Sequence, residues 1–576
     1  MVPDAPIDGK LPSVKPEDRS GDFTFSRGSN LAATRVNKDG LIEKGGENLL
    51  LQSNQFDTTW TNTSSAETSG FEGYDGTNNA WKLEKTGNGG RLRQTISLSG
   101  VNTFSVYAKA GTAKWLRLLF ETISDSYYFD LENGVLGSST SQPVDGNIES
   151  VGNGWYRCSV TGSGTIGAVR IYPADDDLDV TGTSGSIYIQ DAQLEQGLVA
   201  TGYIETTTAA VQKGILENLP RLDYSGGASC PSLLLEPQRT NLLEQAEYYN
   251  TYYIRDGVSV SDNALASPEG LQNASKLVED SANSRHRIGK APFPSGTERT
   301  LSVFAKAGER DYVCLYENNG IGSTLNGVIF DLSDGTLSIN NDNSYYSNPS
   351  IEAVGSNGWY RCSVTWTSLS LSVPSIGVSA DGLENSYQGD GSSGIYIYGA
   401  QLEASSYPTS YIPTYGSSVT RSQDVCNGAV DATNFNDSEG VLYAEIAALA
   451  DDGTFRQLGL TGPTGNNQVN LSFDTTSNRI GGIVVSSGTY YVLNHIVSNT
   501  TLTAKVAIKY KVNDISLYVN GLEVDSISTA VMPSSLNQFN FSIGVGGANK
   551  FYGKTKQLIY FPTALTDDEC IALTTI

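Results

Sequence analysis

One stretch of this chain, IESVGNGWYRCSV at residues 148–160, occurs again almost unchanged as IEAVGSNGWYRCSV at residues 351–364. Further blocks recur in the same order, separated by loops of different length. They begin at Asn48 and Asn241, Phe104 and Leu301, Phe129 and Phe330, and Ile187 and Ile395. The spacing of matched residues rises steadily along the chain from 193 to 208. Because the order is kept while the loops vary, the chain contains a duplicated domain.

Each repeated block has the residue pattern of a β-strand. In the block at residues 155–160, Tyr156, Cys158 and Val160 alternate with Trp155, Arg157 and Ser159, so one of these sets faces a core. The tripeptides Glu132-Asn-Gly and Ser333-Asp-Gly lie between apolar runs and are typical of hairpin turns. The pattern therefore predicts an all-β fold of tandem antiparallel β-sandwiches of jelly-roll type.

The positions of the repeats predict how the chain is divided. After residue 414 the pattern changes, and the hairpin signal Asn520-Gly521 and the helix cap Thr566 belong to a different domain. The first residues carry prolines and no regular pattern, which favours an extended N-terminal arm. We expect an arm at 1–46, a first sandwich at 47–205, a linker at 206–238, a second sandwich at 239–413, a linker at 414–434 and a third sandwich at 435–576.

Composition restricts the class of partner. With 37 basic and 62 acidic residues, the chain carries a net charge of −25, which argues against binding nucleic acid or a polybasic membrane anchor. No run of 18 apolar residues is present, so we expect no membrane insertion. The two histidines, His286 and His495, are too few for a histidine-rich metal centre. Six cysteines and the polar start MVPDAPIDGK favour synthesis in a reducing cytosol.

Several motifs resemble segments of known proteins. They are FSRGSNLAATRVNKDGLIE from Phe25, LLLEPQRTNLL from Leu233, YAKAG, GWYRCSV, AQLE and SYPTSYIPTYGSSVTRSQDV from Ser406. These strings resemble phage and prophage virion proteins such as tail fibres, head fibres and receptor-binding adhesins. The repeated sandwiches are similar to carbohydrate-binding modules, and YVNG and FPTALTDDE resemble a concanavalin A/laminin-G-like lectin domain.

The resemblance implies a location and a set of partners. It implies a protein assembled in the host cytoplasm and exposed on the virion, with the N-terminal arm bound to other virion proteins. It also implies host attachment through surface glycans by a homo-oligomer, for which we favour a trimer. Two alternatives stay open: a head or tail decoration protein that binds only virion proteins, and a carboxylate-dependent polysaccharide depolymerase. No GxSxG, P-loop or HExxH motif is present, so we expect no enzyme.

Candidate glycan contacts are aromatic residues, because exposed tryptophan and tyrosine rings stack on the apolar faces of sugars. Aromatics in strands can equally be core residues or cross-strand pairs, and the repeated Trp155 and Trp359 are assigned to shared packing. The candidates are Trp60, Trp115, Tyr127 and Tyr128 in the first sandwich, Tyr248, Tyr249, Tyr252 and Tyr253 in the second, and Tyr490 and Tyr491 in the third.

A structural Ca²⁺ is the one metal that the resemblance implies, and no cofactor is required. Jelly-roll modules of this kind often hold Ca²⁺ through oxygen ligands between their first and last strands. Asp191 lies where such a carboxylate is expected, whereas its counterpart in the second repeat, Gly399, has no side-chain oxygen. Asp191 is therefore the candidate metal ligand. The acidic run from Asp175 to Asp179 also offers carboxylates, but an acidic loop is more often simply solvated.

Overall fold

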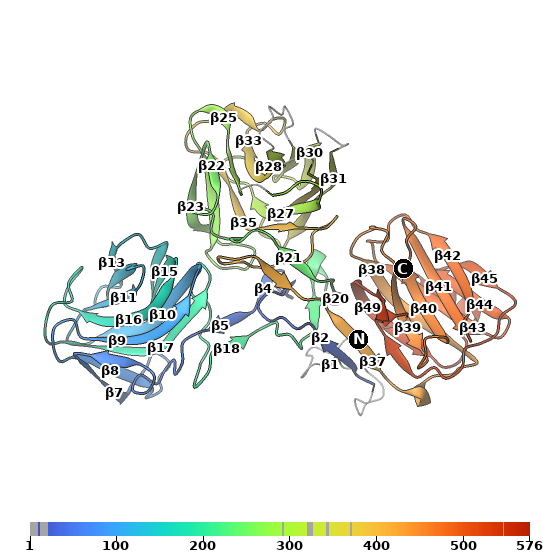
Figure 1. The fold of residues 1–576 in the computed structure, drawn as a ribbon, viewed down its shortest axis with the longest axis horizontal. Coiled ribbons are helices and arrows are strands. Elements are labelled where there is room, and N and C mark those ends of the chain that lie inside the picture. The colour runs from blue at the N-terminus through green and yellow to red at the C-terminus, as the bar shows by residue number, and fades with distance from the viewer. Residues whose placement is uncertain are drawn as a thin grey trace.

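Three antiparallel β-sandwiches surround a centre of short strands (Figure 1). The computed structural model describes residues 10–11, 21–290, 293–318, 327–340, 345–368, 371–544 and 547–576. The predicted fold class, all-β with tandem sandwiches, is confirmed. Across those ranges no helix has the length and apolar character needed to cross a membrane.

The first sandwich consists of two six-stranded sheets. One sheet has the order β14 (Asp145–Gly152), β15 (Trp155–Ser163), β10 (Val101–Ala110), β17 (Ser186–Gln196), β8 (Ala80–Lys85) and β7 (Ser65–Phe71). The other has the order β13 (Val135–Thr140), β12 (Ser126–Asp130), β11 (Trp115–Phe120), β16 (Ile166–Ala174), β9 (Arg91–Leu98) and β6 (Thr61–Thr63). Between them lies a closed core that includes Phe104, Leu118, Val160 and Ile189.

The second sandwich repeats this topology strand for strand. One sheet has the order β31 (Tyr346–Val354), β32 (Trp359–Thr367), β27 (Glu298–Lys306), β35 (Gly394–Glu403), β24 (Ala274–Glu279) and β23 (Val258–Leu265). The other has β30 (Thr336–Asn340), β29 (Val328–Asp331), β28 (Tyr312–Asn318), β33 (Val373–Ser379), β26 (Arg287–Gly289) and β22 (Ile254–Asp256), and β25 (Asn283–Arg285) pairs separately with β34 (Ser386–Gln388). The register also repeats, since Val106 faces Cys158 and Val303 faces Cys362.

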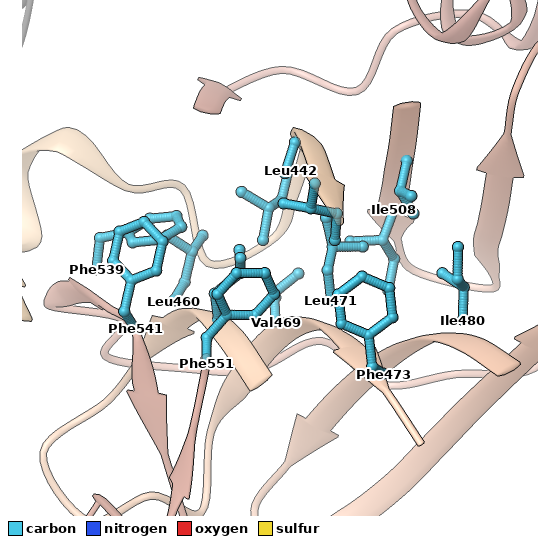
Figure 2. Close-up of a cluster of buried hydrophobic side chains, with 14 of the residues drawn as sticks. Leu442, Leu460, Val469, Leu471, Phe473, Ile480, Ile508, Phe539, Phe541 and Phe551 are labelled. Carbon is cyan, nitrogen blue, oxygen red and sulfur yellow. The ribbon is translucent and has the colours of Figure 1, made fainter. Parts of the chain in front are cut away.

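The third sandwich encloses a separate core rich in phenylalanine (Figure 2). One sheet contains β37 (Val425–Ala429), β46 (Gln538–Asn540), β39 (Arg456–Thr461), β40 (Gln468–Phe473), β41 (Arg479–Ser486) and β42 (Thr489–Ile496), with β47 (Ser542–Ile543) and β48 (Asn549–Lys550) beside them. The other contains β49 (Gly553–Phe561), β38 (Glu439–Ala448), β43 (Ala504–Lys511), β44 (Asp514–Val519) and β45 (Leu522–Ile527). Helix α1 (Asp567–Thr574) follows the capping hydroxyl of Thr566, as predicted.

Segments that the sequence suggested were arm and linkers contribute strands to the third sandwich. β2 (Phe23–Ser26), with β1 (Lys10–Leu11) beside it, pairs with β37, and β20 (Ser232–Leu235) pairs with β49. The physical reason is that Phe25, Leu233 and Leu235 are apolar and complete the third core. Residues 1–9 and 12–20 of the predicted arm lie outside the described residues.

Each repeat begins with a short hairpin that packs on the following sandwich rather than on its own. The hairpin of β3 (Thr34–Val36) and β4 (Ile42–Lys44) precedes the first sandwich, yet Ile42 donates its N–H to Pro268 O of the second at 2.9 Å. The hairpin of β19 (Arg221–Asp223) and β20 precedes the second sandwich and joins a sheet of the third.

Both repeats also close in the same way. β5 (Gly46–Asn48) pairs with β18 (Val211–Lys213) around the first sandwich. β21 (Arg239–Asn241) pairs with β36 (Val419–Arg421) around the second. The repeated unit is therefore larger than the sandwich itself, and it includes most of what the sequence suggested was linker.

Candidate functional site

Five of the ten aromatic candidates are core residues. Tyr249 donates its hydroxyl hydrogen to Ala246 O, Tyr253 donates to Gln245 O, and the indole of Trp60 donates to Gln52 O. The two repeats place Tyr253 and Trp60 at matched positions, which identifies them as shared packing. The prediction of ligand contacts is corrected for these buried rings, because no face is open to a ligand; they are Trp60, Tyr128, Tyr248, Tyr249 and Tyr253.

The other five candidates are partly or fully accessible. Four are half-buried: Trp115, Tyr127, Tyr252 and Tyr491. Tyr491 accepts a hydrogen bond from Val531 N–H at 3.0 Å, so its hydroxyl is already engaged. Tyr490 is 64% exposed and lies on the outer side of β42 in line with Val492 and Ile496. The predicted candidates therefore do not come together at one place, and Tyr490 is the one with an open ring face.

A cluster of aromatic rings that the candidate list omitted lies on the first sandwich. We call it the tyrosine face: Phe71, Tyr74, Tyr107, Tyr188 and Tyr203, all half-buried. Tyr74 and Tyr107 stack with their centroids 3.9 Å apart and their planes within 9°. Phe71 and Tyr188 lie 5.2 Å apart in a tilted arrangement.

The carboxyl of Asp191 lies beneath this face and hydrogen-bonds two of its tyrosines. Its Oδ2 accepts the hydroxyl hydrogen of Tyr74 at 2.8 Å, and Tyr203 is a second hydrogen-bonding neighbour. Burial raises the pKa of Asp191 to about 6, and the two tyrosine hydrogen bonds oppose that rise only in part. The carboxyl thus holds the tyrosine side chains in place at the edge of the solvent.

The backbone explains why Asp191 and Gly399 match. Asp191 has φ 53° and Gly399 has φ 60°, and each lies where the pairing of its strand shifts register. A β-bulge with positive φ favours glycine, and aspartate is among the few other residues that tolerate it. No group of three or more His, Cys, Asp or Glu side chains in the described parts of the chain is arranged to hold a metal ion, around Asp191 or elsewhere.

The matching face of the second sandwich is closed. There Phe304, Trp359, Tyr398 and Tyr411 form a buried cluster with Ile42 of the leading hairpin. The hairpin comes so close that a Cβ on Gly355 would lie 3.0 Å from Gly40 O, whereas nothing lies within 4 Å of the same position at Gly152. Only the first sandwich leaves this face open to solvent.

A comparison of the repeats holds the signal that could have revealed the face. Tyr74 is matched by Pro268 and Tyr107 by Phe304, so both hydroxyls are specific to the first repeat. Aromatics that differ between repeats are better candidates for a ligand than aromatics that are shared. Applied to the strand Val101–Ala110 and to the loop before Ala80, that criterion selects Tyr74 and Tyr107, although it also selects the core residue Phe104, which is matched by Leu301.

A buried ionic cluster, which we call the hub, lies between the closing strand β36 of the second sandwich and the strands β2, β19 and β20 that join the third. Arg27 pairs with Asp424, Arg221 pairs with Asp424 and Glu236, and Arg421 pairs with Glu236. No side chain in it is more than 3% exposed. Burial alone would raise the pKa of Glu236, but Arg421 and Arg221 hold it well below its usual range. Each charged group of the hub is thus paired with at least one group of opposite charge.

Comparisons with known proteins return matches among solved structures. No protein-family model matches this chain, and no curated protein matches it. The CBM40 of the Ruminococcus gnavus IT-sialidase matches with a TM-score of 0.23 and 16% identity over 26% of this chain and 94% of its own. The binding domain of botulinum neurotoxin serotype D matches with a TM-score of 0.20 and 14% identity over 26% of this chain and 40% of its own.

A third similar structure spans more of the chain. The LG1–3 region of the laminin alpha2 chain gives a TM-score of 0.15 and 11% identity over 82% of this chain and 95% of its own. Scores this low leave the function to be argued from the chain's own geometry.

Proposed function

We propose that this chain is a non-enzymatic attachment protein that binds a glycan at the tyrosine face. The observation that carries the proposal is the half-exposed Tyr74–Tyr107 stack, held by Asp191 on the one repeated sandwich whose face is uncovered. An aromatic platform accepts the apolar face of a pyranose ring, and neighbouring hydroxyl and carboxyl groups orient its hydroxyls.

The biological setting follows from the resemblance to fibre proteins. The chain would be exposed on a phage virion, attached to other virion proteins through its N-terminal residues, and would bind host-surface glycans. One open face per chain gives weak binding, so copies must act together, and a homotrimer supplies that avidity. A structural Ca²⁺ remains part of this proposal as an expectation of the resemblance.

Binding of the full chain to a glycan array tests the site. Replacing Tyr74 or Tyr107 with alanine should weaken binding by about tenfold or more, because each ring supplies stacking area and fixes its neighbour. Tyr490→Ala, on the third sandwich, is the matched control and should leave binding unchanged. Loss of binding in the Tyr490 variant alone would move the site to the third sandwich.

A second candidate function is supported by the outer row of β42. Tyr490, Val492 and Ile496 are 64%, 44% and 56% exposed on a strand at the end of its sheet. Apolar rows on edge strands favour contact with another protein. A chain that binds no glycan but binds another particle component tightly, in a manner lost in Val492→Asp, would be a decoration or scaffold protein.

A further inference from the structure

A cavity of about 240 Å³ lies where the first and second sandwiches meet. Its lining residues come from five parts of the chain: residues 31–32 and 44–47, Ser99, residues 195–201, residues 247–273 and residues 413–419. At about 30 Å³ per molecule it has room for about eight waters, which is below the size of most drug-binding pockets. An occupant would therefore be small and would touch both sandwiches.

The cavity wall carries more negative than positive charge. The carboxyl groups of Glu47, Glu195, Glu247 and Glu269 line it, and Lys44 is the one basic residue among the described lining residues. The Glu247 side chain is 1% exposed and that of Glu269 is 3% exposed. Buried carboxylates are costly unless a cation or a proton compensates them.

The hydrogen bonds of Glu247 are distributed unevenly between its two oxygens. Oε1 accepts from Lys44 Nζ at 2.9 Å, and from the hydroxyls of Tyr411 at 2.8 Å, Tyr398 at 3.0 Å and Tyr415 at 3.2 Å. Oε2 has no partner anywhere in the described chain. One oxygen is thus saturated while the other, in a residue that lines the cavity, lacks a donor.

The remaining polar groups of the wall need donors as well. Asn273 donates through Nδ2 to Glu269 at 3.1 Å, but its Oδ1 has no donor among the residues that the structure describes. Lys44 has no hydrogen to spare, because Glu247, Glu269 and Tyr415 take its three. The two buried side-chain atoms of the described wall that lack a partner are both acceptors, so an occupant that satisfies them has to supply hydrogens.

We propose that this cavity binds a small alkylammonium ion, with its ammonium group on Glu247 Oε2 and Asn273 Oδ1. The alkyl part would lie against the apolar lining residues Leu31, Leu198, Val199, Leu271 and Pro413. A divalent metal fits less well, since no metal-binding group of three His, Cys, Asp or Glu exists in the described ranges. The bound ion would join the two repeated sandwiches at their contact.

Binding of a cation in this cavity should be coupled to the release of protons, whereas binding of a cation at the protein surface should not. Burial raises the pKa values of Glu47, Glu195 and Glu269, so these groups hold protons to higher pH than free glutamate does. Tyr398, Tyr411 and Tyr415 stay neutral beside them, because burial raises their pKa values also. A cation that replaces the protons should release them on binding, and its affinity should rise with pH.

Calorimetry of the full chain with 1,4-diaminobutane in 150 mM NaCl tests the inference. We expect one saturable site per chain, proton release on binding, and at least tenfold weaker binding of the neutral analogue 1,4-butanediol. Glu247→Gln should weaken diamine binding at least tenfold. The matched control is Glu132→Gln, which removes the same charge at an exposed position outside the cavity and should leave the affinity within twofold.

Three outcomes would overturn the proposal: no saturable binding, equal binding of the diol, or equal loss in the two glutamine variants. If Glu247→Gln fails to fold, Glu47→Gln replaces it, because Glu47 lies in the cavity wall outside the Lys44 network. Tyr74→Ala should leave diamine binding intact. Failure at the cavity is therefore separable from failure of the proposed glycan site.

Discussion

Asp191 and Gly399 show how one residue position can separate two copies of a domain. Both lie in a left-handed bulge, with φ 53° and 60°, where glycine is free of strain and aspartate is tolerated. Glycine lets the second sandwich pack closely, since a Cβ on Gly399 would lie 2.9 Å from the ring of Phe304. Aspartate adds a carboxyl beneath the tyrosine face of the first.

The raised pKa of Asp191 predicts that this carboxyl lowers the free energy of unfolding as the pH rises. Its folded pKa of about 6 exceeds the usual 3.8, so its favourable contribution is present below about pH 4 and is lost as the pH rises through 6. Asp191→Asn should therefore be more stable than the parent chain at pH 7.5, by about 1–2 kcal/mol, with a smaller difference at pH 4.5. Urea unfolding at the two pH values measures this.

Groups that titrate alike in the parent chain and in Asp191→Asn cancel when the two free energies of unfolding are subtracted. An equal stability difference at pH 4.5 and pH 7.5 would show that Asp191 does not titrate in this range. Asparagine suits the test because it also tolerates positive φ and keeps the side-chain oxygen near Tyr74.

At the scale of elements, the repeat predicts long strands well and short ones poorly. The blocks around Phe104, Trp155 and Ile187 and their copies all form strands, because they combine alternation with runs of six or more residues. β2 has four residues, and its partner strand begins about 400 positions later, with Phe25 opposite Cys426. A pattern of four residues carries too little information to name so distant a partner.

Phe25 is predicted to contribute strongly to the third sandwich. It is 2% exposed and packs into the core of that domain, so Phe25→Ala should cost about 3–5 kcal/mol through lost burial and the resulting cavity. Hydrogen exchange at β37 and β46 would show the loss locally. Thr24→Ala, on the exposed side of the same strand, is the control and should cost far less. Unchanged exchange in Phe25→Ala would mean that β2 does not belong to the core.

This placement also changes how the predicted docking arm must be tested. A truncation of residues 1–46 removes β2 and the leading hairpin as well as any docking segment. Failure of such a truncation to enter particles would not separate docking from folding. A deletion that retains Phe23–Ser26 is the informative one.

At the scale of the whole molecule, the hub was beyond prediction from the sequence. Its arginines Arg27, Arg221 and Arg421 come from three separate segments, and the pair formed by Arg27 and Asp424 spans 397 positions. Neither periodicity nor spacing links groups so far apart. The sequence likewise predicted three sandwiches but not that hairpins from one repeat close the next, which depends on tertiary packing alone.

Removing one charged partner from the hub should lower the free energy of unfolding strongly. Asp424→Asn leaves Arg27 and Arg221 with reduced compensation in a fully buried site, at a cost of about 3–5 kcal/mol. Because the pKa of Glu236 is depressed, its contribution is complete above about pH 4.5 and declines only below that. At pH 5, calorimetric melting should therefore show one cooperative transition for the wild type and separate transitions for Asp424→Asn. A single unshifted transition would argue against the hub as the link between sandwiches.

The pairing of β2 with β37 makes residues 27–424 a long insertion between two adjacent antiparallel strands of the third sandwich (Figure 1). The insertion holds both repeated sandwiches, and between them it also contacts the third sandwich, where β20 pairs with β49. If the N-terminus is anchored and the third sandwich carries the load, tension enters the ladder lengthwise along Phe23–Ser26. Backbone hydrogen bonds loaded in that direction share the force and must rupture together, so the grip of the molecule under load would depend on those four residues.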